Sequence, residues 1–404
     1  MSYQLLTNSA DPATPASGKT TLYVNSEGLP CSLGGDGVLN VLADVERNNL
    51  LRNSGFWWAQ RQGVPGSLTT YSNTTGRAIC ADGWGITNEN NGVNYRRWDT
   101  SGSAEAGLQS QFYGDFVKAT STGKCVVSQV IESIDCLQAR GQTVRLQVWL
   151  RRYATNATVR IGLAQLTAAG TIDTIPATFI SAFGANSTDP TLGTNLAYIA
   201  PKSGTTADGG TISGNCVSCS VTASWQRFGA VFEVPATMKN LVVVIFGNSQ
   251  FAVGDGFSVG QVSLTVGQEI QTWNPQPLRT EILRVLRYYQ KTFSIDTGPA
   301  QNAGATSGAL SCITRFAAAT ALAGLWQWRY PVELRVAATT LTMYNPGAAN
   351  ANARRVTGTS APADQSATAT VNSTAQSVEV TCTGDANGAF GDQLLIHLSA
   401  DAEL

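Results

Sequence analysis

The stretch Val144-Arg-Leu-Gln-Val-Trp-Leu150 alternates apolar and polar side chains over most of its length. A period of two is typical of a β-strand with one buried face, because successive side chains of a strand point to opposite sides of the sheet. Comparable strand-like runs lie at residues 159–163, 228–234, 241–246 and 257–266. Many short strands with few helical periods between them predict a jelly roll or β-sandwich over residues 46–274.

After this region, apolar residues recur with the period of a helix, and strand-like runs follow. Ile282, Leu283 and Leu286 recur at helical spacing within residues 280–291, which predicts an amphipathic helix. We expect this helix to lie in a linker, residues 275–295, between two β-domains. Strand-like runs resume at residues 326–330, 332–336, 377–380 and 393–397. They predict a C-terminal β-sandwich over residues 296–404.

The first 45 residues have a different character. Residues 11–19 read DPATPASGK, a short strand-like run follows at residues 21–24, and residues 34–37 form a Gly-Gly-Asp-Gly turn. This pattern favours an extended arm with one hairpin, which has too little apolar surface to fold alone. We therefore expect residues 1–45 to dock on another protein. The predicted fold class is all-β, with jelly-roll or β-sandwich domains in series, one short linker helix and an extended N-terminal arm.

Composition and charge narrow the classes of function. The chain has 404 residues, which is more than one core usually organises, and only 13% of them are charged. Its 26 basic and 27 acidic residues nearly cancel, so a nucleic acid or an anionic membrane is not an expected partner. The N-terminus lacks the pattern of a secretory signal, and the apolar run at residues 241–246 is too short to span a membrane. We expect a soluble protein.

Motifs for catalysis are missing from the sequence. His397 is the single histidine, and no P-loop, no GxGxxG in a strand-to-helix setting and no HExxH motif is present. Cys216 and Cys219 form one CxxC, which favours a turn with two buried thiols over a zinc or redox site. The sequence therefore predicts a non-enzymatic protein with no catalytic residues, no metal site and no cofactor.

Aromatic residues are frequent between residues 56 and 116. Rigid Trp and Tyr rings can stack on sugars when they are exposed, and they fill cores when they lie in strand patterns. Core positions are expected for Trp57, Trp84, Trp149 and Trp225. Tyr95 and Trp98 lie in the polar, loop-like stretch at residues 88–102, and they are the candidate glycan-binding residues.

Several strings, in the same order along the chain, resemble fibre proteins of tailed bacteriophages and prophages that contain a carbohydrate-binding-module-like jelly roll. They are NNLLRNSGFWWAQR at 48–61, ADGW at 81–84, QVIESID at 129–135, QTVRLQVWL at 142–150, WQRF at 225–228, VSLTVGQE at 262–269, EILRVLRYYQK at 281–291 and HLSADAEL at 397–404. The N-terminal arm is similar to virion-attachment segments of head and tail fibres, through Asp11, Pro12, Pro15, Leu22 and Tyr23.

This resemblance implies a structural tail fibre or appendage, assembled in the bacterial cytoplasm and located in the virion. Its arm would dock on tail or capsid proteins, its subunits would form a homotrimer, and its jelly roll would contact host surface polysaccharide during attachment. No membrane insertion is implied. A head fibre or capsid decoration protein without receptor binding is an alternative. A polysaccharide depolymerase is a further, minor one, because the sequence can neither exclude nor locate a pair of facing carboxylates among its 27 acidic residues.

Overall fold

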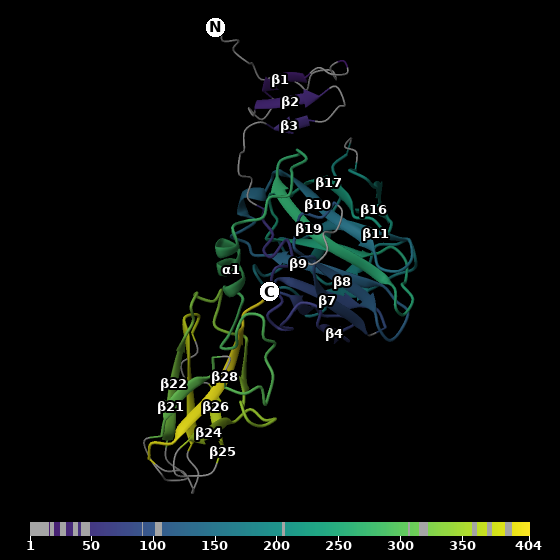
Figure 1. Cartoon of the computed structure of the whole chain (residues 1–404). Helices are drawn as coiled ribbons and strands as arrows, with labels where there is room; N and C mark the ends of the chain where they lie inside the picture. The colour runs from purple at the N-terminus through teal and green to yellow at the C-terminus, as the bar shows by residue number, and fades with distance from the viewer. Residues whose placement is uncertain are drawn as a thin grey trace.

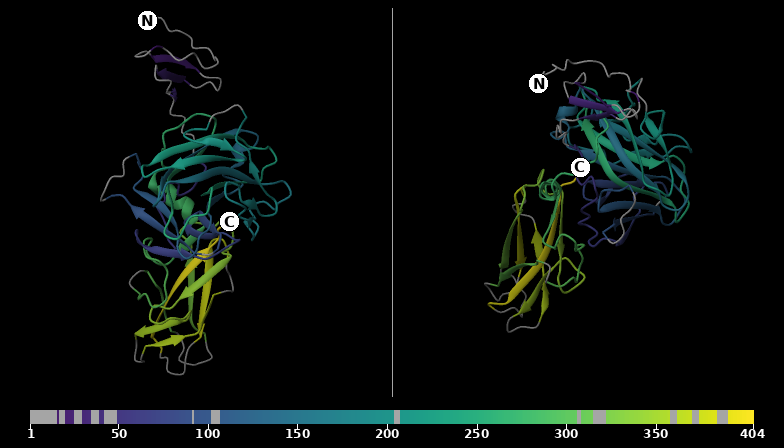
Figure 2. Two further views of the ribbon diagram at one scale, coloured as in Figure 1. Left: turned by 90° about the vertical axis from the view of Figure 1, so that its right-hand side faces the viewer. Right: turned by 45° about the horizontal axis from the view of Figure 1, so that its top comes forward.

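The computed structural model describes residues 16, 20–24, 30–34, 39–41, 49–90, 92–101, 107–203, 207–305, 308–314, 322–357, 362–369, 374–383 and 390–404. These residues form mainly β-strands in antiparallel sheets, together with one short α-helix. A small N-terminal sheet, a large β-sandwich and a C-terminal β-domain follow one another in space, and the C-terminus lies where the last two meet (Figures 1 and 2). The predicted fold class is confirmed.

The N-terminal sheet has three strands: β1 Thr20–Val24, β2 Pro30–Gly34 and β3 Leu39–Val41. They pair antiparallel in chain order, with Tyr23 opposite Cys31. The expected hairpin is therefore present, and a third strand extends it. Asp11, Pro12 and Pro15 lie outside the described residues, so virion docking through this region stays a prediction.

The large sandwich begins with a six-stranded sheet in the order β17-β10-β19-β8-β7-β4. Its strands are β4 Leu68–Tyr71, β7 Val93–Asp99, β8 Phe112–Lys118, β10 Thr143–Arg152, β17 Gln226–Glu233 and β19 Gly256–Val266. The predicted strands at residues 144–150, 228–234 and 257–266 are confirmed, each to within a residue or two at its ends.

The facing sheet has eight strands and follows the path β15-β16-β11-β18-β9-β6-β5, with β14 paired to β11. Its strands are β5 Ala78–Ala81, β6 Trp84–Asn88, β9 Cys125–Ile131, β11 Ala157–Leu166, β14 Leu196–Ile199, β15 Thr211–Ser213, β16 Cys216–Val221 and β18 Asn240–Gly247. A 3-10 turn, η1 Leu137–Ala139, and a two-stranded sheet, β12 Ile180–Ala182 with β13 Thr191–Leu192, lie in its connections.

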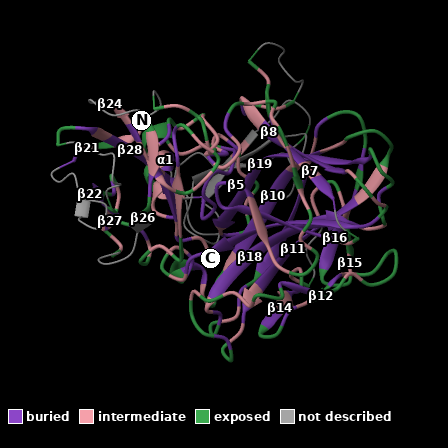
Figure 3. Ribbon diagram, turned by 90° about the horizontal axis from the view of Figure 1, so that it is seen from below, coloured by how far each residue is buried: buried purple, intermediate pink, exposed green. Residues whose placement is uncertain are grey.

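The two sheets differ in how many of their faces carry an apolar cluster. In β18, Val243 and Ile245 join the core between the sheets, whereas Val242 and Val244 join a second apolar cluster on the other side. The strand is therefore buried along its whole length, as Figure 3 shows for the centre of this sheet. Burial on both faces explains the continuous apolar run at residues 241–246. The alternating run at 144–150 belongs to the other sheet, on whose second face the described residues form no such cluster.

Cys216 and Cys219 lie on strand β16, so the prediction that they form a turn was wrong. Because their separation is odd, they point to opposite sides of the sheet: Cys216 joins the outer apolar cluster and Cys219 joins the central core. Burial raises the pKa of both thiols. The pair cannot converge on one ion, and no group of three metal-ligating residues occurs within the described ranges.

Helix α1, Leu278–Leu286, is shorter than predicted. Residues 280–291 were expected to be helical throughout, but Tyr289–Lys291 form strand β20, which pairs with a long strand of the C-terminal domain, β28 Gln393–Asp401. Pairing with a neighbouring strand outweighs the local helical period, because tertiary context overrides propensity. None of the helices in the part of the chain that is described is long and apolar enough to cross a membrane.

The C-terminal domain is built around β28, which pairs with four other strands. The remaining strands are β21 Leu310–Ile313, β22 Leu322–Arg329, β23 Thr340–Tyr344, β24 Ala353–Thr357, β25 Ala363–Gln365, β26 Ala367–Ala369 and β27 Ser377–Thr383. Residues 332–336 were predicted as a strand and are irregular. Leu334 and Arg335 donate their N–H groups to Ala375 and Arg287, which lie in different segments, so no ladder forms.

His397, the single histidine, lies inside the C-terminal domain. It is fully buried, and its ring stacks on Phe293 with centroids 4.0 Å apart. Its ring nitrogens lie 3.0 Å from the Thr292 hydroxyl and 3.0 Å from the Gly304 carbonyl. Burial lowers its pKa. These contacts fit a neutral histidine with a structural role.

The connection between β12 and β13 is fixed by a buried lysine. The Lys124 ammonium donates to three carbonyl oxygens of this connection, those of Phe183, Ala185 and Thr188, at 3.1, 2.6 and 3.1 Å. We expect Lys124→Met to lower the free energy of unfolding by about 2–3 kcal/mol, because the three carbonyls lose the ammonium donor and, among the described residues, only that of Ala185 keeps a hydrogen bond, from Thr188. Denaturant titration measures this. Lys202→Met, at a more exposed ion pair with Glu233, is the control and should cost about 0.5 kcal/mol; equal losses would contradict the prediction.

Candidate functional site

The outer face of the six-stranded sheet, which is the side turned away from the core, is the candidate site. On β7, Val93 and Tyr95 point into the core, while Asn94, Arg96 and Trp98 point to the outer face. Residues 88–102 were predicted to be loop-like. That prediction was wrong over residues 93–99, because the polar residues occupy alternate positions of a strand whose other face is buried.

The two aromatic candidates therefore lie in different environments. Tyr95 is fully buried and packs on Phe116, with ring centroids 5.2 Å apart, so neither face of its ring is open to a ligand. Trp98 is 37% exposed, on the outer face. The Arg96 guanidinium covers one side of the indole, 4.0 Å from the ring centroid. Of the pair, Trp98 is the residue that presents a ring to solvent.

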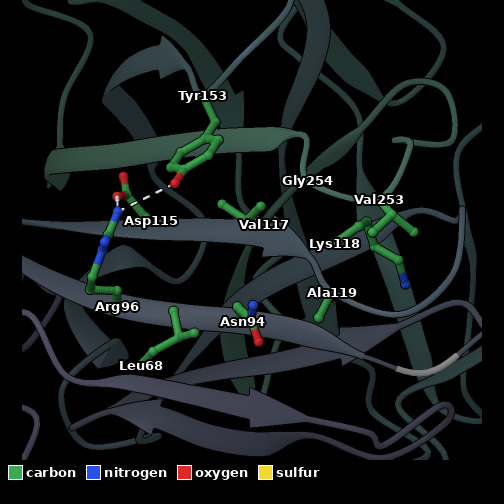
Figure 4. A pocket seen from close by; sticks show the side chains of 10 residues that line it. All are labelled: Leu68, Asn94, Arg96, Asp115, Val117, Lys118, Ala119, Tyr153, Val253 and Gly254. Atoms are coloured by element: carbon green, nitrogen blue, oxygen red, sulfur yellow. Dashed lines mark hydrogen bonds and ion pairs between the residues drawn. The ribbon is translucent and has the colours of Figure 1, made fainter.

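A groove of about 320 Å³ lies on the outer face, across β4, β7 and β8 (Figure 4). Three exposed apolar or aromatic side chains border it, and they are Leu68, Tyr153 and Val253. Its polar lining comes from Asn94, Arg96, Asp115 and Lys118. Open apolar rims with a few convergent polar groups are typical of sites for small polar ligands.

An ion pair lies at one end of the groove. Arg96 Nη2 is 3.2 Å from Asp115 Oδ2 and 3.4 Å from the Tyr153 hydroxyl. Asp115 also accepts a hydrogen bond of 2.7 Å from Ser258. Burial raises the pKa of the Asp115 carboxyl, although the bonds from Ser258 and Arg96 oppose this effect. The groove thus offers a donor and an acceptor side by side with their charges balanced, an arrangement that suits the hydroxyl groups of an uncharged sugar.

The other end of the outer face is closed by its own side chains. The Arg151 guanidinium lies 5.1 Å from the Tyr113 ring centroid and 5.0 Å from that of Trp225. Trp225 is buried, and its ring and Leu108 lie over Gly260, where an added Cβ would be 2.9 Å from Leu108. These aromatic residues stabilise the sheet and leave the groove as the open part of the face.

The tryptophans expected in the core divide into two groups. Trp84 and Trp225 are buried, whereas Trp57 and Trp149 are half-buried. The sequence reasoning missed Tyr153, although a signal was present. The alternation that begins at residue 144 places Trp149, Arg151 and Tyr153 on one face, and Tyr153 is the exposed member of that series.

Most of the strings that resemble phage fibre proteins lie away from the groove. Residues 49–61, 81–84, 281–291 and 401–404 meet where the sandwich joins the C-terminal domain, through contacts such as Arg52 with Glu403 and Asn53 with Glu281. The groove draws mainly on residues outside these strings. The resemblance therefore concerns the architecture of the chain more than its ligand contacts.

Comparisons with known proteins give distant structural likenesses. No family model and no curated protein matches the sequence. The enzymatically active domain of tailspike protein 4 of bacteriophage CBA120 is similar at 11% identity, over 54% of this chain and 21% of that chain, with a TM-score of 0.30. The modules of endo-1,4-β-D-xylanase 10B of Clostridium thermocellum are similar at 12% identity, over 46% and 26%, with a TM-score of 0.28.

A third likeness is to the xylan-binding domain of Xyn10C from Paenibacillus barcinonensis, at 9% identity, over 55% of this chain and 97% of that domain, with a TM-score of 0.27. This chain spans about a fifth of the length of the tailspike domain and about a quarter of the xylanase modules. The activities in those names belong to those proteins.

Proposed function

We propose that this chain is a structural fibre or appendage protein of a tailed bacteriophage, and that its large sandwich binds a host surface glycan in the groove of the six-stranded sheet. The observation that carries the glycan part is the open outer face, where Tyr153 and the Arg96–Asp115 pair border one groove. The phage part is supported by the ordered strings that resemble fibre proteins. The N-terminal arm docks on the virion, and the protein acts without catalysis.

Affinity in this proposal comes from many weak sites. The groove is open, and its one exposed aromatic ring among the described lining residues, that of Tyr153, supplies limited contact area to each sugar. If the chain forms a homotrimer and several copies occupy one virion, linked sites raise the effective affinity by orders of magnitude without any new contact. We therefore expect each site of the isolated protein to bind glycan weakly.

The test is a substitution of Tyr153. We expect Tyr153→Ala to weaken binding to immobilised host polysaccharide about tenfold, which is about 1.4 kcal/mol, because stacking on the ring and the hydroxyl beside Arg96 are removed together. Binding of the full chain to a glycan array and to whole host cells measures this. Phe390→Ala, at an 80% exposed ring of the C-terminal domain, is the matched control and should bind like the unchanged protein.

Other results would favour the alternatives. If neither the array nor the cells bind the unchanged protein, the glycan part is wrong, and a head fibre or capsid decoration role takes its place. That role is favoured because several of the strings that resemble phage fibre proteins lie at the joint between the two domains and not in the groove. A depolymerase has weaker support, because Asp115 is the only carboxylate among the described residues that line the groove, and cleavage by a carboxylate pair needs two. Release of sugar products would establish it.

A further inference from the structure

Three arginines of the large sandwich converge on the C-terminal segment of the chain, Asp401-Ala-Glu-Leu404. Arg52, Arg61 and Arg77 come from separate places in the sequence, and each contacts this segment. The side chains of Arg52 and Glu403 are 4% and 6% exposed, so their ion pair is removed from solvent. We call the three arginines, together with the backbone N–H of Gly83, the arginine site.

Both carboxylates of the segment and one of its backbone carbonyls have a partner in the arginine site. Arg52 Nη2 lies 2.7 Å from one carboxylate oxygen of Glu403, and the N–H of Gly83 donates to the other oxygen at 3.1 Å. Arg61 Nη2 lies 2.8 Å from the Asp401 carboxylate. Arg77 Nη1 donates to the backbone carbonyl of residue 404 at 2.6 Å. The site therefore binds both carboxylates and the backbone of one short peptide.

The sandwich holds the arginines in place by separate bonds. Arg52 Nη1 donates to the Val130 carbonyl at 3.0 Å, and Arg77 Nε donates to the Ser128 hydroxyl at 2.9 Å. Gly83 has a φ of +84°, and a Cβ there would lie 2.8 Å from Arg52 Nε, so glycine is required for this approach. The site is therefore built from the sandwich's own strands and turns rather than by the segment that fills it.

The charges on the two sides are complementary. Asp82 pairs with Arg61 at 3.2 Å, so the site keeps an excess of two positive charges, and Asp401 and Glu403 supply two negative ones. Burial alone would raise the pKa of the Glu403 carboxyl. The three arginines of the site hold that pKa below its usual value. The site thus favours an ionised acidic peptide.

We infer that the arginine site is a binding site for an acidic peptide, and that residues 401–404 of this chain occupy it as a latch. Because Asp401 is the last residue of β28, the central strand of the C-terminal domain, binding of this segment fixes that domain against the sandwich. The latch does not depend on glycan binding.

A second set of contacts extends the joint along α1 and β20. Arg284 donates to the carbonyls of Leu50 and Leu51 at 3.1 Å each, and Lys291 donates to the Gln60 carbonyl at 2.7 Å. Glu281 accepts from the N–H of Asn53. The latch is therefore one part of a continuous joint, and its loss should loosen that joint without removing the fold of either domain.

The first experiment is Glu403→Gln in the full chain. This change keeps the shape of the side chain and removes its charge. We expect the domains to uncouple: thermal unfolding should separate into two transitions, or its first midpoint should fall, and the radius of gyration by small-angle scattering should increase. Glu233→Gln is the matched control, because Glu233 is 66% exposed in its pair with Lys202, and it should leave both measurements unchanged.

Hydrogen exchange of the unchanged protein gives an independent test that needs no variant. The N–H of Gly83 donates to Glu403, and the N–H of Ala402 donates to the Tyr288 carbonyl at 2.8 Å. Both amides should exchange as slowly as those of the sandwich core. Exchange at the rate of an unstructured peptide, or a Glu403→Gln protein identical to the unchanged one in unfolding and scattering, would overturn the inference.

Discussion

Trp84→Ala is expected to lower the free energy of unfolding by about 3–5 kcal/mol, which is a large fraction of the stability of an ordinary domain. Trp84 is fully buried at the start of β6 and stacks on Phe56, with ring centroids 5.2 Å apart. Its indole N–H donates to the Asn53 carbonyl at 3.0 Å. Alanine removes the ring and leaves a cavity. It also removes one of the donors to that carbonyl, which keeps the hydrogen bond from the Phe56 N–H. Denaturant titration followed by fluorescence and circular dichroism measures the loss.

Trp98→Ala is the matched control for this change. The same substitution is made in the same sandwich, but Trp98 is 37% exposed on the outer face. Its removal should cost less than about 1 kcal/mol, because this indole packs on the Arg96 side chain at an open sheet face and leaves no enclosed cavity. Equal costs at the two positions would show that Trp84 does not hold the core together.

Arg61→Met is expected to lower the free energy of unfolding by about 3–5 kcal/mol, because it leaves the buried Asp82 carboxylate without its counter-ion. Arg61 lies 3.2 Å from Asp82 and 2.8 Å from Asp401, and its guanidinium also stacks on the Tyr289 ring at 3.8 Å from the centroid. The side chain of Asp82 is only 1% exposed. Methionine replaces the stem and removes the charge, so the loss is mainly electrostatic. Thermal and denaturant unfolding measure it.

The loss should depend on pH in a definite direction. In the unchanged protein the pKa of Glu403 is lowered from 4.5, so its stabilising effect is present above that pH and is lost as the pH falls through the folded-state pKa. In the Arg61→Met protein Asp82 and Asp401 lose this partner, and Glu403 keeps Arg52 but loses one of the charges that lower its pKa, so these carboxyl groups take up protons more readily. The difference between the two proteins should therefore be largest near neutral pH and should shrink on acidification. A constant difference would contradict the assignment of the loss to charge.

Arg227→Met is the control for a general effect of removing arginine. Arg227 is 36% exposed on β17 and pairs with Asp208 at 2.8 Å. An ion pair near the surface is worth little after screening, so this change should cost less than about 1 kcal/mol and should show little dependence on pH.

The strands of the large sandwich could be predicted because their signal is local. The alternating run at 144–150 belongs to a sheet with an apolar cluster on one face, and the continuous run at 241–246 belongs to a sheet with apolar clusters on both faces. Both patterns are recognisable within a few residues of sequence. The errors arose where a distant partner decides the structure. Tyr289 to Lys291 continue a helical period but pair with β28, more than a hundred residues later.

The groove was only partly predictable for a related reason. Trp98 was found from its residue type and polar surroundings, but Tyr95 shares those surroundings and is buried. Odd-numbered and even-numbered positions of a strand point to opposite faces of the sheet, and this decides which of the two residues is buried. The faces cannot be assigned until the strand itself is recognised. Arg96 and Asp115 become a pair because β7 and β8 are neighbours in register, with these two residues opposite each other.

The sequence by itself determined the all-β class, the order of the parts and the lack of recognisable catalytic motifs, since hydrophobic period and residue type are properties of short segments. The tertiary structure alone decided which sheet face stays open and which charges meet at the joint. Arg61 and Asp401 are separated by 340 residues, and Arg52 and Glu403 by 351. Charged residues that form ion pairs follow no periodic pattern in the sequence, and each can attract any opposite charge. Only the folded backbone therefore specifies which two residues pair.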